Sequence, residues 1–438
     1  MNVLASDIQA VPANRYALGR GRAWFAFAMT IGLMVVDYLD RQVIVSLFPY
    51  IKAEWSVSDT QLGALVSVIS VTVALAGIPV ALLADRWSRV RSIVVMATVW
   101  SLATISCVFT RNYGQLMTAR AAVGLGEAGY GSVGAALIAS IFPARMRATL
   151  LAAFFASASI GSVLGVMLGG IIAARWGWQA AFGVVGVPGL VLALLYLKVR
   201  DYRTVALTPA HAGQKDSTAV FALKSLTRSP TMLWVCLGAA AQLVVLSSVW
   251  AWLPSFLHRY HGMAPDVAGI RAALVVLIGA AGSMVWGMVV DRAGGRQTRR
   301  KLYVMAALCV LTMLILGPTF AATDTGLAGG TQLVLIALGG FVMTCTVGPV
   351  AAIVMDVTHP GLRATGASIL SLFQNLLGLA AGPVIAGSLS DAFGLTMALA
   401  AVPVFSAIAA VLFLVASQTY EADIQRTEAA AEARPKAE

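Results

Sequence analysis

Twelve apolar runs, each of about 20 residues or more, constrain the fold of this chain more than any other feature of its sequence. Hydrophobic residues make up 59% of the chain and charged residues only 11%, whereas soluble domains carry roughly 25% charged residues. Inside a bilayer an apolar segment must satisfy its own backbone hydrogen bonds, as a helix does. The sequence therefore predicts an all-α membrane protein with twelve transmembrane helices. The runs lie near 23–49, 60–84, 92–110, 114–141, 149–173, 179–197, 231–257, 265–290, 301–321, 331–356, 365–388 and 394–417.

A long polar segment, 198–230, separates the first six runs from the last six. We therefore expect two six-helix bundles, over 23–197 and 231–417, joined by a cytoplasmic linker over 198–230. A polar leader, 1–22, precedes them and a tail, 418–438, follows. The leader has no apolar core followed by a small-residue cleavage site, so we expect it to stay on the chain in the cytosol.

The lysines and arginines are distributed unevenly over the predicted loops. The leader, the linker, the tail and the loops on the same side as these contain 23 of the 30 basic residues. The opposite loops contain five, which are Lys52, Arg111, Arg175, Arg259 and Arg271. Because basic loops remain on the cytoplasmic side, both termini are expected in the cytoplasm. The expected location is the cell membrane, which is the inner membrane if the source is bacterial.

Two sequence matches relate the halves of the chain. The loop "ALLADRWSRVR" (81–91) matches "GMVVDRAGGRQ" (287–297), and "RAT" occurs at both 147–149 and 363–365. Four glycines follow the "RAT" triplet in each half, and they have the same spacing in both. The matched glycines are Gly161, Gly165, Gly170 and Gly177 in the first half and Gly378, Gly382, Gly387 and Gly394 in the second. Two six-helix halves of the same orientation form a parallel repeat, which is an arrangement found in transporters.

Several function classes are disfavoured by the sequence. The net charge is +11, but nucleic-acid binding requires the basic residues on one soluble surface, and here they border predicted membrane spans. The four histidines fall in loops or at helix ends, and the four cysteines fall on separate predicted helices. Neither HExxH nor GxxxxGK[ST] occurs. We expect no nucleic-acid partner, no metal, no cofactor and no enzymatic activity.

Charged residues inside the first predicted helix are the most specific functional signal. The stretch "DYLDRQV" (37–43) contains Asp37, Asp40 and Arg41, which share one helix face because they are three and four residues apart. Each ionised side chain at the centre of a membrane helix costs roughly 2.5 to 3.5 kcal/mol. Such residues need a compensating role.

A second group of charges lies on the predicted helix 114–141. Arg120 and Glu127 are seven residues apart and share one face of that helix. The predicted depth of Arg120 permits an ion pair with Asp40, and Asp37 and Glu127 then lie deeper. Burial raises the pKa of a carboxylate and a nearby guanidinium lowers it, so such a group suits proton binding. The alternative is that these charges only hold the two helices together.

The paired D-R loops and "GLGEAGYG" (124–131) with Arg120 resemble the major facilitator superfamily, as does the glycine-spaced run 149–173. The resemblance covers nearly the whole chain. Ala81 departs from the glycine that usually begins the loop motif, and the run 149–173 lacks the Gly-Pro pair of many exchangers. Three glycines in this run, spaced by four, are expected to permit close helix packing.

Within that superfamily, "DYLDR", "GEAGY" and "WAWLPSFL" (250–257) are similar to the spinster-like lipid transporters. The segment "RWGWQAAF" (175–182) is shared with organic-anion symporters, and this keeps a second function open. The resemblance implies a monomeric secondary transporter that works by alternating access in the lipid bilayer. The carboxylates within the predicted helices indicate coupling to protons. The alternative is a proton-coupled organic-anion symporter of the same superfamily.

The predicted helices 231–257, 331–356 and 365–388 of the second half carry no charge at mid-depth, in contrast with the charged helices 23–49 and 114–141 of the first half. A charged wall facing an apolar wall suits an amphipathic, lipid-like or lysolipid-like substrate. The expected proton-coupling residues are Asp37, Asp40 and Glu127. The expected substrate contacts are Arg41, Arg120, Tyr130, Gln242, Trp250, Gln374 and Asn375. By resemblance, the expected gating residues are Asp85, Arg86, Arg89, Asp291, Arg292 and Arg296.

Overall fold

The computed structural model describes residues 19–199, 229–295, 297–325, 329–358 and 363–432. Every regular element within these residues is a helix, which confirms the predicted all-α class. Nearly all of the predicted leader and linker lies outside the described residues.

The described helices form two sets along the chain. The first set is α1 (Arg20–Val43), η1 (Ile44–Ser46), α2 (Phe48–Trp55), α3 (Asp59–Arg86), α4 (Arg89–Ser106), η2 (Cys107–Phe109), α5 (Tyr113–Glu127), α6 (Tyr130–Ile141), α7 (Ala144–Trp176) and α8 (Trp178–Tyr196). The second set is α10 (Pro230–His261), α11 (Pro265–Gly294), α12 (Arg300–Ala321), η4 (Ala322–Thr325), α13 (Gly329–Met343), α14 (Pro349–Asp356), α15 (Arg363–Phe373), η6 (Gln374–Leu379), α16 (Ala381–Phe393), α17 (Leu395–Ala401) and α18 (Val404–Glu432).

Eleven helical stretches of the described chain are long and apolar enough to cross a bilayer. The position of the predicted tenth span holds α13, a shorter apolar helix, which α14 follows after a turn. Pro349 begins α14. A proline has no N–H to donate and clashes with the preceding turn, so a continuous helix is disfavoured at this point.

The predicted span 114–141 is also broken, at a position next to a candidate site residue. Glu127 ends α5, and Gly129 adopts φ 83° before α6 begins at Tyr130. Residues with a side chain rarely adopt this backbone conformation, whereas glycine adopts it readily. The break therefore places the Glu127 carboxyl at a helix end, where the regular helical hydrogen bonds stop.

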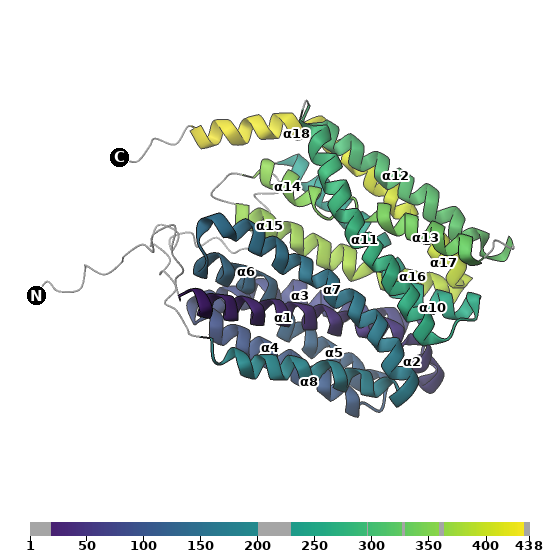
Figure 1. The fold of residues 1–438 in the computed structure, drawn as a ribbon. Coiled ribbons are helices and arrows are strands. Elements are labelled where there is room, and N and C mark those ends of the chain that lie inside the picture. The colour runs from purple at the N-terminus through teal and green to yellow at the C-terminus, as the bar shows by residue number, and fades with distance from the viewer. Residues whose placement is uncertain (1–18, 200–228, 296, 326–328, 359–362, 433–438) are drawn as a thin grey trace, which may run out of the picture.

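The two sets pack side by side in Figure 1, where the purple-to-teal helices form one group and the green-to-yellow helices the other. The main contacts between the sets are α7 with α11 and α3 with α16. We call the end at which α1 begins and α18 ends, on the left of Figure 1, the terminal end, and the opposite end the distal end.

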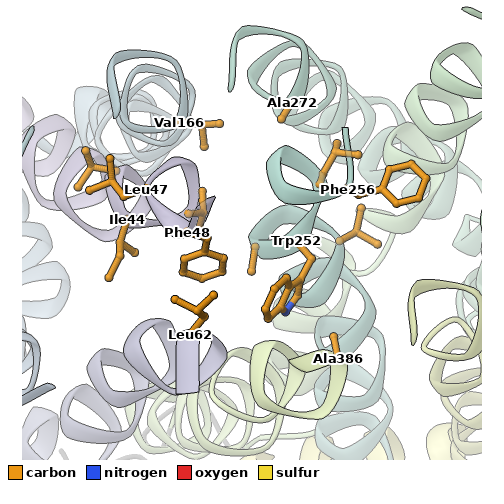
Figure 2. Close-up of a cluster of buried hydrophobic side chains, with 14 of the residues drawn as sticks. Ile44, Leu47, Phe48, Leu62, Val166, Trp252, Phe256, Ala272 and Ala386 are labelled. Carbon is orange, nitrogen blue, oxygen red and sulfur yellow. The ribbon is translucent and has the colours of Figure 1, made fainter. Parts of the chain in front are cut away.

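The buried side chains show how the two sets meet. One cluster at the distal end contains residues of both sets, among them Phe48 and Leu62 with Trp252 and Phe256 (Figure 2). The rings of Phe48 and Trp252 have centroids 5.1 Å apart. Two further clusters of described residues, toward the terminal end, are each confined to one set. The sets therefore share a core at the distal end and keep separate cores toward the terminal end.

Glycines permit close backbone approach within and between the sets. A Cβ added at Gly161, Gly165 or Gly169 of α7 would lie 2.3 to 2.6 Å from carbonyl oxygens of α1. This confirms the prediction that these glycines permit close helix packing. Between the sets, a Cβ at Gly63 would lie 2.3 Å from the carbonyl oxygen of Pro383. The distal contact thus requires a residue without a side chain at position 63.

Candidate functional site

The structure brings together the five charged residues that the sequence predicts inside the membrane. Asp37, Asp40 and Arg41 lie in the last two turns of α1, and Arg120 and Glu127 lie in α5. They form two groups, and each group contains residues of both helices.

The first group consists of Asp37, Arg41 and Glu127. The Nε atom of Arg41 lies 3.1 Å from Oδ1 of Asp37 and 2.9 Å from Oε2 of Glu127. The Arg41 side chain is 17% exposed, whereas those of Asp37 and Glu127 are 4% and 0% exposed. The guanidinium also lies over the ring of Tyr38, 5.2 Å from its centroid. One cation, whose side chain is itself partly exposed, therefore serves two buried carboxyl groups.

The Glu127 carboxyl is buried and shares its one cation with Asp37. Among the described residues neither of its oxygens receives a hydrogen bond, because the Nε–H of Arg41 is directed at Asp37 although Glu127 is close enough for an ion pair. Two ionised carboxyl groups beside one guanidinium leave one negative charge uncompensated, and one bound proton would remove it. The geometry therefore suits the binding of one proton by this group.

The second group, Asp40 with Arg120, is fully enclosed. Nη1 of Arg120 donates to Oδ1 and to the backbone oxygen of Asp40, each at 3.2 Å. Thr104 of α4 donates a hydrogen bond to the other carboxylate oxygen. The Arg120 and Asp40 side chains are 0% and 1% exposed. The predicted Asp40 to Arg120 pair is confirmed, and in this structure Arg120 does not reach solvent.

Tyr130, a predicted substrate contact, begins α6 and is fully buried. Its hydroxyl donates a 2.6 Å hydrogen bond to the backbone oxygen of Thr30 in α1. Its ring packs edge-on against Trp100 and Phe154. In this structure Tyr130 connects α6 to α1, α4 and α7 through these contacts.

The predicted contacts of the second set lie on two elements, α10 and η6. Gln242 of α10 donates to the backbone oxygen of Met343 at 2.9 Å, and its Oε1 has no hydrogen-bond partner among the described residues. The indole N–H of Trp250 also has no hydrogen-bond partner there. Gln374 and Asn375 begin η6, a π-helical segment, and such segments often occur at functional sites.

The predicted gating residues are only partly described. Arg89, at the start of α4, donates to the hydroxyl of Ser140 in α6 at 2.9 Å. Asp291 and Arg292 are exposed at the end of α11. The side chains of Asp85 and Arg86, and residue Arg296, lie outside what the structure describes. The gating role of these residues stays a prediction.

One charged cluster was missed by the sequence reasoning. It lies at the distal end and consists of Lys52, Asp59, Arg259, Ser390 and Asp391, which we call the distal charge cluster. Its bonds join α3 of the first set to α10 and α16 of the second. Each residue lies near the end of a predicted span, where a charge is usual. Their sequence positions therefore give no signal that they meet.

No group of three or more histidine, cysteine, aspartate or glutamate side chains in the described part of the chain is arranged to hold a metal ion.

The chain is similar to known proteins of one superfamily. The profile of the Major Facilitator Superfamily matches residues 30–381. The chain is 29% identical over 417 residues to an MFS-type efflux pump of Mycolicibacterium smegmatis (strain ATCC 700084 / mc(2)155), a match that covers 93% of this chain and 95% of that protein. It is 26% identical over 397 residues to Protein spinster of Drosophila melanogaster, covering 87% of this chain and 64% of that protein.

A solved structure has the same fold. The crystal structure of a bacterial homolog to the human lysosomal transporter Spinster, in an inward-facing and unoccupied conformation, superposes with a TM-score of 0.81. The match covers 92% of this chain and 99% of that chain at 22% sequence identity.

Proposed function

The chain belongs to the Major Facilitator Superfamily, and we propose that it is a secondary transporter that couples proton binding to the binding of an anionic, amphipathic substrate. The observation that carries this proposal is the buried carboxyl of Glu127, which receives no hydrogen bond among the described residues and shares the guanidinium of Arg41 with Asp37. Arg41, whose side chain is partly exposed, is the residue that a substrate anion would reach.

The three charges of this group connect the two binding events. Without an added proton, two carboxylates face one guanidinium, and the group has a net charge of −1. A proton shared by Asp37 and Glu127 makes the group neutral and leaves the Arg41 guanidinium available for an anionic head group, which forms charge-assisted hydrogen bonds with it. The bound anion in turn favours the protonated state. Coupling of this kind is reciprocal, so each ligand increases the affinity for the other.

Two six-helix bundles, over 23–197 and 231–417, are proposed to provide alternating access. We take the terminal end as cytoplasmic, which is what the distribution of basic residues predicts, and the shared distal core would then close the outer side in this conformation. The separate cores toward the terminal end leave the inner sides of the bundles free to move apart. In this proposal the protein spans the cell membrane and acts as a monomer.

The substrate class follows from the difference between the two sets. Near η6, the second set offers the partly exposed apolar side chains of Leu376 and Leu377, together with polar side chains such as Asn375. An acyl chain beside these residues and an anionic head at Arg41 would use both sets at once. We therefore propose a lysolipid-like substrate. Its charged head would bind the first set, and its tail would bind the second.

Flux in proteoliposomes tests this function. We expect purified protein to accumulate a radiolabelled anionic lysophospholipid when a pH gradient is imposed, and to stop doing so when the gradient is dissipated. Glu127→Gln should abolish gradient-driven accumulation. Glu421→Gln, a change of the same kind at a half-exposed position on α18, should not. Accumulation of a short organic acid in place of the lysophospholipid would support the organic-anion alternative. Gradient-driven accumulation by Glu127→Gln would overturn the proposed proton site.

A further inference from the structure

The distal charge cluster contains a bidentate ion pair between the two sets. Nη1 of Arg259 lies 2.6 Å from Oδ2 of Asp59, and Nη2 lies 2.7 Å from Oδ1. Ser390 of α16 donates to Oδ2 of Asp59 at 2.5 Å, and Lys52 of the short helix α2 donates to Oδ1 at 2.5 Å. The Asp59 side chain is 3% exposed. A carboxylate of the first set is thus held by two groups of the second.

The N-terminal end of α3, which carries Asp59, also receives a carboxylate from the second set. The side chain of Ser58 caps the N–H of Gln61, which leaves the N–H groups of Asp59 and Thr60 without partners in α3. Both donate to the carboxylate of Asp391 in α16, each at 2.8 Å. The hydroxyl of Thr60 donates to the same carboxylate at 2.6 Å. A side chain of the second set therefore caps the N-terminus of a helix of the first, where negative charge is favoured.

These contacts exist only while the distal ends are packed together. A Cβ at Gly387, in the same helix as Asp391, would lie 2.5 Å from the backbone oxygen of Asp59. A separation of a few ångströms at this crossing would break both the Asp59 to Arg259 pair and the cap by Asp391, because hydrogen bonds weaken steeply with distance.

We propose that Asp59 and Asp391 are positioning residues of the transport cycle, which hold the distal end closed through this reciprocal pair of bonds. The proposal rests on the proposed alternating-access function, but these residues belong neither to the proposed proton site nor to the expected substrate contacts. Their loss shifts the conformational equilibrium toward a state that is open at the distal end.

Distance measurements between spin labels test this role without substrate or a proton gradient. One label pair, at Gln115 and Ala264, spans the distal end, and a second, at Arg145 and Gln297, spans the terminal end; all four positions are exposed. The four native cysteines are buried, which limits unwanted labelling.

Asp391→Ala is the main variant. We expect it to raise the population of long distal distances by on the order of tenfold relative to the wild type, since it removes several bonds to a charged group. The terminal label pair should show a matching increase in short distances. A purely local structural role would change thermal stability but leave both distance distributions unchanged.

Glu54→Ala is the matched control. Glu54 is also a carboxylate of the distal end, but its hydrogen bonds to Trp178 and Gln179 stay within the first set. We expect it to leave both distributions as in the wild type. If Asp391→Ala does not fold, Arg259→Lys replaces it, because lysine keeps the charge but cannot bridge both oxygens of Asp59.

Unchanged distal distances in a folded Asp391→Ala or Arg259→Lys variant would overturn the proposal. This result would leave the proposed transport function intact, since that function is tested by flux. Conversely, a distance shift in a protein without proton-driven flux would support the positioning role and contradict the coupling.

Discussion

The enclosed pair of Asp40 and Arg120 predicts a large and asymmetric effect on stability. Arg120→Met removes the guanidinium and leaves the Asp40 carboxylate, 1% exposed, with Thr104 as its remaining side-chain hydrogen-bond partner among the described residues. Removing one member of a buried ion pair costs about 3 to 5 kcal/mol. Asp40→Asn should cost less, about 1.5 to 3 kcal/mol, because Arg120 keeps the backbone oxygens of Asp40 and Arg41 as acceptors.

The double variant, Asp40→Asn with Arg120→Met, should lose less free energy of unfolding than the two single losses combined. The assay is equilibrium unfolding of the purified protein in mixed micelles, followed by circular dichroism, with the four proteins forming a double-mutant cycle. Arg175→Met, at an exposed position near the end of α7, is the matched control and should cost less than about 0.5 kcal/mol. A loss below about 1 kcal/mol for Arg120→Met would refute the reasoning and would favour the predicted role of Arg120 as a substrate contact.

Two further predictions concern the distal contact and the substrate. Gly63→Val should force the distal ends apart, since its Cβ alone would lie 2.3 Å from the Pro383 oxygen; a cysteine at the buried position Ser46 should then react with a membrane-impermeant maleimide. Gly131→Val is the control, because a Cβ there meets nothing within 4 Å, and it should leave that cysteine protected. Equal protection of the cysteine in the Gly63→Val and Gly131→Val variants would contradict the expected separation of the distal ends. Lysophospholipid affinity, measured by thermal shift, should rise with acyl length by about 0.8 kcal/mol per buried methylene. Affinity that is independent of chain length would favour a short organic anion.

The sequence predicted the features that depend on regular helices. Asp40 and Arg120 form the expected pair, because depth along a continuous helix can be counted from its ends. The same holds for Gly161, Gly165 and Gly169, whose spacing of four places them on one face of α7 against α1.

Features that depend on helix breaks were not predicted. The sequence of the span that contains Glu127 predicts one continuous helix, since glycine is common in membrane helices. In the structure Gly129 adopts a left-handed backbone conformation, and the helix is interrupted there. The turn before Pro349 likewise divides one predicted span into α13 and α14. Hydrophobic periodicity does not report the backbone conformation of a single residue.

The distal charge cluster could not be predicted for a different reason. Asp59 and Asp391 are 332 residues apart, and their contact depends on how the two sets cross. Tyr130 is a similar case, because its aromatic ring and hydroxyl suit a substrate contact as well as the internal hydrogen bond to Thr30 that the structure shows. Residue type gives the chemistry that is possible, and the tertiary arrangement decides which partner is used.

The pH dependence of substrate affinity tests the central claim most directly, which is that Asp37 and Glu127 share a proton whose binding is linked to that of an anion at Arg41. Affinity for an anionic lysophospholipid should be measured from about pH 5 to 8, the range that brackets a perturbed carboxyl group, in the wild type, Glu127→Gln and Asp37→Asn. The account predicts that wild-type affinity rises as the pH falls, because the protonated state favours the anion. In Glu127→Gln, which mimics that state, binding should persist with a flat pH profile. A wild-type profile retained in both variants would contradict the account and would leave the charges of α1 and α5 as a structural contact between the two helices.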